Sequence, residues 1–153
     1  MACENSYDES KLVLFGAPFD GTSSYRPGSR FAPTAIRAES FGIETYSPNL
    51  KKDLEDVPVF DAGDLEFPMG NTKKVLSQIE EMSQKIISDN KIPLMMGGEH
   101  LVTLGSVRAV VKKYPNLNMV HFDAHADLRD DYIGETLSHA TVIRRCFELL
   151  NDG

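Results

Sequence analysis

The sequence predicts an α/β fold, a three-layer α/β/α sandwich in which helices cover both faces of a mostly parallel sheet. Short apolar runs typical of strands alternate with segments of helical periodicity along the 153 residues. The strand-like runs are almost continuously apolar, as burial on both faces of a sheet requires. Hydrophobic residues make up 41% of the chain and charged residues 25%, as in ordinary globular domains.

Four segments have the composition of buried strands. They are residues 11–16, 57–62, 92–96 and 117–123. In a parallel sheet the carboxyl ends of such strands meet at one edge, which is where open α/β sheets bind ligands.

The clearest predicted helix covers residues 71–90. Apolar residues recur there at steps of four, three and four, which places them on one helix face: Val75, Ile79, Met82 and Ile86. Asn71 is suited to cap the first turn. A second helix is expected over residues 101–113, a short one after Pro33, and a last one over residues 136–150.

Charge and composition exclude several classes of partner. The net charge of −7, with no local cluster of basic residues, argues against nucleic acid and permits a cationic substrate. No apolar run is long enough to cross a membrane, and the polar N-terminus lacks the features of a secretory signal. We therefore expect a cytoplasmic protein with no membrane contact, in which Cys3 and Cys146 are reduced thiols.

Residues 16–30 form a different kind of segment. Glycine and proline interrupt it repeatedly and two arginines add charge. It is interpreted as a shaped loop, although such a segment is more often a simple connector than a functional loop.

Residues 121–127 carry the strongest chemical signal. Asp123, His125 and Asp127 alternate after an apolar strand, so an extended backbone would point them to one side. Alone, this pattern could also be a polar loop that caps the next helix. His100, which follows two glycines at the end of the preceding strand, favours a metal site because it should reach the same edge. The parity of position 121 places His121 on the same side as His125, but a deeper position beneath the ligands is the preferred interpretation.

Carboxylate and imidazole ligands without thiolate suit a hard divalent ion such as Mn²⁺ better than structural zinc. Two ions sharing a carboxylate could activate a water molecule for hydrolysis. His139 is a candidate proton shuttle to a leaving amine. From the residues alone, a surface histidine near a helix start is an equally good interpretation.

Together these motifs resemble the ureohydrolase family, which includes arginase, agmatinase, guanidinobutyrase and formiminoglutamase. The resemblance extends from residues 16–22 and 26–37 through 61–64 to 97–100 and 123–127. It implies an arginase-like α/β/α fold and two Mn²⁺ ions that activate water against a guanidinium carbon. It also implies that His100 and Asp127 bind one ion and His125 the other, that Asp123 bridges both, and that His139 is the proton shuttle.

Residues 127–141 look most like bacterial agmatinases. Arg129 stands where arginases have a small polar residue near the substrate's carboxylate, so agmatine, hydrolysed to putrescine and urea, is the expected substrate. Guanidinobutyrase, arginase or formiminoglutamase activity stays open. The resemblance further implies a small cationic guanidinium substrate and a trimer or hexamer.

The family also takes ligands from a later Asp-x-Asp motif, which does not occur in this sequence. Asp61 and Asp64 match an earlier family element and are not expected to replace it. Residues 1–153 are therefore expected to form the N-terminal portion of one ureohydrolase domain, incomplete and nearly inactive alone. A non-enzymatic α/β module that binds metal is the remaining alternative.

Overall fold

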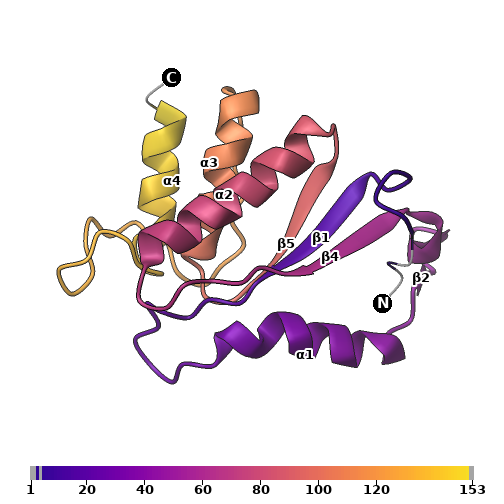
Figure 1. Cartoon of the computed structure of the whole chain (residues 1–153), viewed down its shortest axis with the longest axis horizontal. Coiled ribbons are helices and arrows are strands. Elements are labelled where there is room, and N and C mark those ends of the chain that lie inside the picture. The colour runs from indigo at the N-terminus through magenta and orange to yellow at the C-terminus, as the bar shows by residue number, and fades with distance from the viewer. Residues whose placement is uncertain (1–2, 4, 152–153) are drawn as a thin grey trace.

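The computed structural model describes residue 3 and residues 5–151, and its centre is a three-stranded parallel sheet in the order β4-β1-β5 (Figure 1). The strands are β1 (Leu12–Ala17), β4 (Val59–Asp64) and β5 (Ile92–Gly97). Both outer strands pair with β1, and Leu12 lies opposite Val59 on one side and Ile92 on the other. The first three predicted strands are confirmed to within two residues, and their carboxyl ends meet at one edge.

Helices cover both faces of this sheet (Figure 1). One face carries α1 (Ala32–Glu39), and the other carries α2 (Thr72–Ser88), α3 (Val102–Lys113) and α4 (Val142–Asn151). The predicted α/β/α sandwich is confirmed. None of the helices in the described part of the chain is long and apolar enough to span a membrane.

The predicted cap and apolar face of α2 are also confirmed. The side chain of Asn71 accepts a hydrogen bond from the backbone N–H of Lys74 at 3.0 Å, which satisfies a first-turn donor. Val75 and Ile79 are buried together with Ile86, and Met82 packs against the same core. Hydrophobic burial of this face against β1 and β5 therefore fixes the helix.

Two apolar clusters form the core. The first lies between the sheet and α2 and is built from Val13, Phe15, Ala17, Val75, Ile79, Ile86 and Val102. The second joins α2, α3 and α4 and is built from Leu76, Leu101, Leu104, Val107, Val142, Ile143 and Cys146. The second cluster ties α4 to the rest of the domain.

Short elements that the sequence did not predict connect the larger ones. They are the 3₁₀ turns η1 (Ser29–Phe31), η2 (Ser40–Gly42) and η3 (Leu54–Asp56), and a small antiparallel pair, β2 (Tyr46–Ser47) with β3 (Lys52–Asp53). Local hydrogen bonds rather than a periodic apolar pattern hold them, so periodicity does not reveal them.

The predicted strand over residues 117–123 is wrong. Within residues 5–151 this segment forms no ladder with a neighbouring strand. Its apolar side chains Val120 and Phe122 are 75% and 95% exposed, so no packing stabilises them. Apolar composition alone cannot make a strand when the segment has no hydrogen-bonding partner.

The last helix begins six residues further along the chain than predicted. It starts at Val142 rather than at residue 136, because residues 136–141 form turns held by the side chain of Thr141. The Thr141 hydroxyl accepts from the Ser138 N–H at 3.0 Å and donates to the carbonyl oxygen of Thr136 at 2.8 Å.

Candidate metal centre and active site

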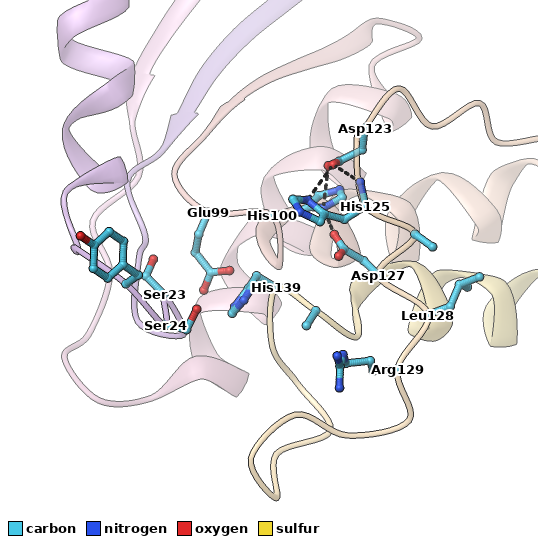
Figure 2. Close-up of a pocket in the computed structure, with 13 residues that line it drawn as sticks. Ser23, Ser24, Glu99, His100, Asp123, His125, Asp127, Leu128, Arg129 and His139 are labelled. Atoms are coloured by element: carbon cyan, nitrogen blue, oxygen red, sulfur yellow. Dashed lines mark hydrogen bonds and ion pairs between the residues drawn. The ribbon is translucent and has the colours of Figure 1, made fainter.

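Two loops bring an imidazole and two carboxylates together at the carboxyl edge of the sheet. His100 follows β5, and Asp123 and Asp127 lie in the loop that precedes α4. Nδ1 of His100 lies 2.7 Å from Oδ2 of Asp127 and 3.6 Å from Oδ2 of Asp123. Figure 2 shows these groups converging from separate elements. The structure thus joins three of the four predicted metal ligands.

A close backbone approach places His100. The N–H of Gly98 donates to the carbonyl oxygen of Ala17, and the N–H of Glu99 donates to that of Phe19, at 2.9 and 2.7 Å. A Cβ atom added to Gly98 would lie only 1.9 Å from the Phe19 oxygen. Glycine at position 98 therefore lets the loop after β5 run against the loop after β1.

The start of α4 fixes Asp127. Its carbonyl oxygen accepts hydrogen bonds from the N–H groups of Ile143 and Arg144, at 3.1 and 3.2 Å. These are first-turn donors that have no partner inside the helix. Asp127 has a φ of 48°, in the left-handed region that few residues other than glycine adopt. Tertiary contacts thus hold a strained backbone that presents its carboxylate to His100.

His125 is placed differently from its three predicted partners. Oδ1 of Asp123 accepts the backbone N–H of His125 at 2.9 Å, and this bond is the main reason that the pKa of Asp123 lies below its usual value. The His125 ring is 82% exposed, with Nδ1 3.4 Å from Oδ1 of Asp123. The backbone bends here and is not an extended strand, yet Asp123, His125 and Asp127 all line one pocket.

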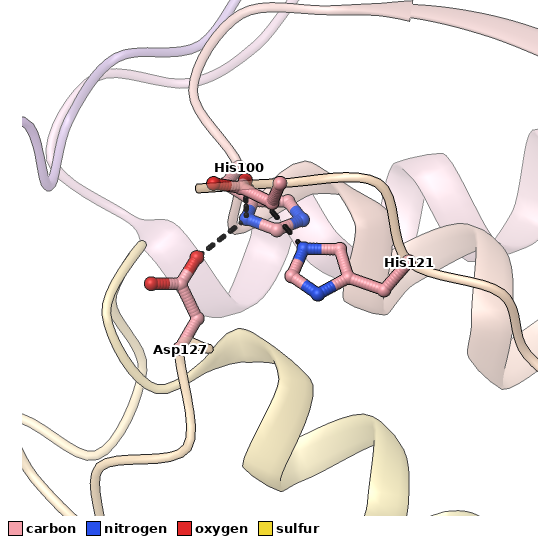
Figure 3. Close-up of side chains that lie close together, drawn as sticks. His100, His121 and Asp127 are labelled. Carbon is pink, nitrogen blue, oxygen red and sulfur yellow. Dashed lines mark hydrogen bonds and ion pairs between the residues drawn. The ribbon is translucent and has the colours of Figure 1, made fainter. Parts of the chain in front are cut away.

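His121 joins the cluster instead of lying deeper beneath it. Its ring stacks on that of His100, with centroids 5.1 Å apart and planes at 27°. Nε2 of His121 lies 3.5 Å from Oδ2 of Asp123 and is buried without a hydrogen-bond partner in the described structure. Figure 3 shows the two rings with Asp127. This is the placement that the parity of position 121 indicated in the sequence.

The donor set fits a hard divalent cation. One atom from each of His100, His121, Asp123 and Asp127 lies within 4.8 Å of the others. Opposite ligands of an octahedral ion with bonds of about 2.1 Å are about 4.2 Å apart, so small side-chain movements would close the shell. A cation would also provide the partner that the buried Nε2 of His121 lacks, and imidazole with carboxylate suits Mn²⁺.

His100, Asp123 and Asp127 line a pocket of about 820 Å³, together with His125. Its wall includes Glu99, Arg129 and His139, and Ser23 to Tyr25 of the loop after β1 close one side (Figure 2). That loop is therefore more than a connector. The guanidinium of Arg129 lies over the ring of Tyr132, 5.7 Å from its centroid.

The loop after β1 is held by Asp20, which the sequence interpretation did not single out. The Asp20 carboxylate is buried and accepts from Nε of Arg30 at 2.6 Å and from the Gly28 N–H at 2.7 Å. The hydrogen bond from Arg30 is the largest cause that lowers the pKa of Asp20, and it outweighs the opposing effect of burial. This closure fixes the part of the loop that lines the pocket.

Asp61 and Asp64 lie at the end of β4 but bind Arg37 of α1. Nε and Nη2 of Arg37 donate to the two carboxylate oxygens of Asp61, at 2.6 and 2.8 Å, and Nη1 donates to Asp64. Burial raises the pKa of Asp61, but the bonds from Arg37 and Gly63 outweigh it, so the net pKa is lowered. These carboxylates attach α1 to the sheet, in keeping with the expectation that they are not metal ligands.

Comparison with known proteins agrees with this architecture. The agmatinase of Bacillus cereus is 52% identical over 145 residues, which cover 95% of this chain and 50% of that protein. The agmatinase of Bacillus subtilis is 51% identical over 150 residues, which cover 98% of this chain and 52% of that protein. The chain thus spans about half the length of the curated relatives it matches.

Solved structures and family models give the same result. The crystal structure of agmatine ureohydrolase of Thermoplasma volcanium matches with a TM-score of 0.89 and 41% identity, covering 98% of this chain and 50% of that one. Residues 10–152 match the model of the arginase family. The match includes both loops of the candidate metal centre. The chain therefore belongs to the arginase family.

Proposed function

We propose that residues 1–153 form the N-terminal portion of a single domain that hydrolyses a guanidinium substrate with the help of Mn²⁺. Agmatine is the proposed substrate, and putrescine and urea are the products. The observation that carries the proposal is the convergence of His100, Asp123 and Asp127 on the lining of one pocket. Mixed imidazole and carboxylate donors beside a pocket are typical of metal-assisted hydrolysis.

The proposed metal ligands are His100, Asp123, His125 and Asp127, and two ions are expected in the complete site. His121 is a further donor within reach of the same place. A divalent cation held there would lower the pKa of a water molecule, so that a nucleophile is available near neutral pH.

The remaining chemistry falls to side chains of the pocket. Oxygen from water then bonds to the guanidinium carbon, and the bond from that carbon to the alkylated nitrogen breaks. Both hydrogens of the water end on the departing nitrogen, which already carries one hydrogen, and His139 on the pocket wall is the proposed carrier of the proton. The products are urea and the protonated amine, so charge and atoms balance.

The choice of agmatine is supported by the names of similar relatives, since the matching proteins of Bacillus cereus and Bacillus subtilis are both agmatinases. One observation favours a second candidate, and it weighs against the use of Arg129 as an argument for agmatine. Arg129 places a positive charge on the pocket wall, where it would repel the distal ammonium of agmatine and attract a carboxylate. A guanidine that ends in a carboxylate, such as guanidinobutyrate, is therefore the competing substrate.

The test is a substrate panel. The complete polypeptide that contains these residues is incubated with Mn²⁺ and agmatine, arginine, guanidinobutyrate or formiminoglutamate, and urea or formamide is measured with the amine product. We expect agmatine to be hydrolysed fastest and Asp123→Asn to abolish turnover. If the native enzyme prefers guanidinobutyrate and the Arg129→Gln variant prefers agmatine, guanidinobutyrate replaces agmatine as the proposed substrate. Metal binding without hydrolysis of any substrate would support a non-enzymatic module instead.

Cytoplasmic location and assembly into a trimer or hexamer stay predictions from the sequence. Sedimentation of the complete polypeptide would test the second of these.

A further inference from the structure

Thr22 connects the pocket histidine to a buried carboxylate. The Thr22 hydroxyl donates to Oε1 of Glu99 at 2.5 Å, and the Thr22 N–H donates to the same oxygen at 3.0 Å. On its other side, the Thr22 hydroxyl accepts the backbone N–H of His139 at 3.1 Å. The carbonyl oxygen of Thr22 lies 2.8 Å from Nδ1 of the His139 ring. Thr22 therefore contacts His139 twice, across 117 residues of sequence.

The contact with the carbonyl oxygen determines the tautomer of His139. A carbonyl oxygen can only accept a hydrogen bond, so Nδ1 must carry the hydrogen. In the neutral ring Nε2 is then the basic nitrogen. Nε2 makes no hydrogen bond among the residues that the structure describes, and His139 lines the pocket (Figure 2). The free lone pair belongs to the nitrogen that can exchange a proton with a bound molecule.

Glu99 keeps Thr22 in this position. The Glu99 side chain is only 8% exposed. Besides the two bonds from Thr22, its second oxygen accepts the Leu101 N–H at 3.1 Å, so the carboxylate acts only as an acceptor. The hydroxyl hydrogen of Thr22 is thereby directed to Glu99, which leaves an oxygen lone pair for the His139 N–H.

We propose that Thr22, anchored by Glu99, is a positioning residue that holds His139 in the Nδ1–H tautomer with Nε2 free toward the pocket. The catalytic meaning of this arrangement rests on the proposed role of His139, but the tautomer itself does not. The carbonyl oxygen that bonds Nδ1 is a main-chain atom, so the Thr22 hydroxyl acts on the tautomer by holding this carbonyl and the His139 N–H in place. The tautomer is therefore the property to measure.

The experiment uses ¹⁵N-histidine-labelled chain and long-range ¹H–¹⁵N spectra at about pH 8.5, where imidazole is ordinarily neutral. The chain has only four histidines. The set of ring signals that is missing from the spectrum of the His139→Gln variant belongs to His139. We expect the Nδ1–H pattern for His139. We expect Thr22→Val, which keeps the shape but removes the hydroxyl, to mix the two tautomers, and Thr22→Ser to keep the native pattern. Thr34→Val is the control, because among the described residues its hydroxyl bonds only Asp64, at 3.4 Å.

An Nε2–H pattern in the native chain overturns the proposal, and so does an unchanged pattern in a folded Thr22→Val variant. If Thr22→Val does not fold, the native pattern still decides. In the complete polypeptide, Thr22→Val should lower kcat with little change in KM, and Thr22→Ser should restore most of it. If no guanidine is hydrolysed, the proposed function is wrong. The NMR spectra still decide whether Thr22 sets the tautomer of His139.

Discussion

Nδ1 of His100 lies 2.7 Å from Oδ2 of Asp127, a contact that joins the loop after β5 to the start of α4. Each partner is held by main-chain hydrogen bonds of its own, from Gly98 and Glu99 to the β1 loop and from α4 to the Asp127 carbonyl oxygen. The candidate metal centre is therefore part of the scaffold rather than an addition to it. Changes in the supporting backbone should alter metal binding even where no ligand is replaced.

The first prediction concerns Gly98. A methyl group at this position would overlap the carbonyl oxygen of Phe19, so the two loops must separate. We expect Gly98→Ala to lower the free energy of unfolding by about 1–3 kcal/mol, the usual cost of overpacking, and to weaken Mn²⁺ binding. Urea unfolding and Mn²⁺ titration measure the two effects.

Gly42→Ala is the matched control, because a Cβ atom there meets no other atom within 4 Å. It should change neither quantity. Equal stability of the Gly98 and Gly42 variants would show that the β1 and β5 loops are not held as closely as described.

The second prediction concerns acid stability. The pKa of Asp20 is lowered in the folded chain, chiefly by the hydrogen bond from Arg30. Its contribution to stability is therefore complete above the ordinary carboxyl pKa of about 4 and is lost as pH falls through the lower folded pKa. Asp20→Asn should be less stable than the native chain near neutral pH, and the difference should shrink below about pH 4. Urea unfolding at several pH values measures it, and a difference independent of pH would contradict this account.

The third prediction concerns the Cys146 thiol. It is fully buried against α3, and burial raises its pKa to about 11. Since the thiolate is the reactive form, we expect Cys146 in a Cys3→Ser chain to react with a disulfide reagent near neutral pH only as fast as the chain opens. Reaction in urea should be fast. Fast labelling of the native chain would show that α4 does not pack as described.

Much of the fold could be predicted because buried faces of helices and strands require apolar residues at regular spacings in the sequence. The steps between Val75, Ile79 and Ile86 identified α2, and continuous apolar runs identified β1, β4 and β5. The segment 117–123 has the same kind of composition without a pairing partner in the described chain. A strand is a property of two segments, so the pattern of one is insufficient.

The candidate site was predictable in its residue types and less so in its geometry. Spacing brought His100, Asp123 and Asp127 to one edge of the sheet, and the structure joins them. It could not show that the bend at His125 exposes that ring while His121 stacks on His100. The roles of Thr22 and Asp20 depend on hydrogen bonds between distant segments, which have no periodic signature.

The most direct test of the central claim is where Mn²⁺ binds. Addition of Mn²⁺ to ¹⁵N-labelled chain should broaden the amide signals of residues 98–100 and 121–127 first, because a paramagnetic ion relaxes nearby nuclei. Asp127→Asn should weaken this binding at least about tenfold, whereas Asp56→Asn, at an exposed carboxylate outside the cluster, should not. Broadening spread evenly over acidic surface residues, or unaffected by Asp127→Asn, would contradict a metal centre at this edge of the sheet.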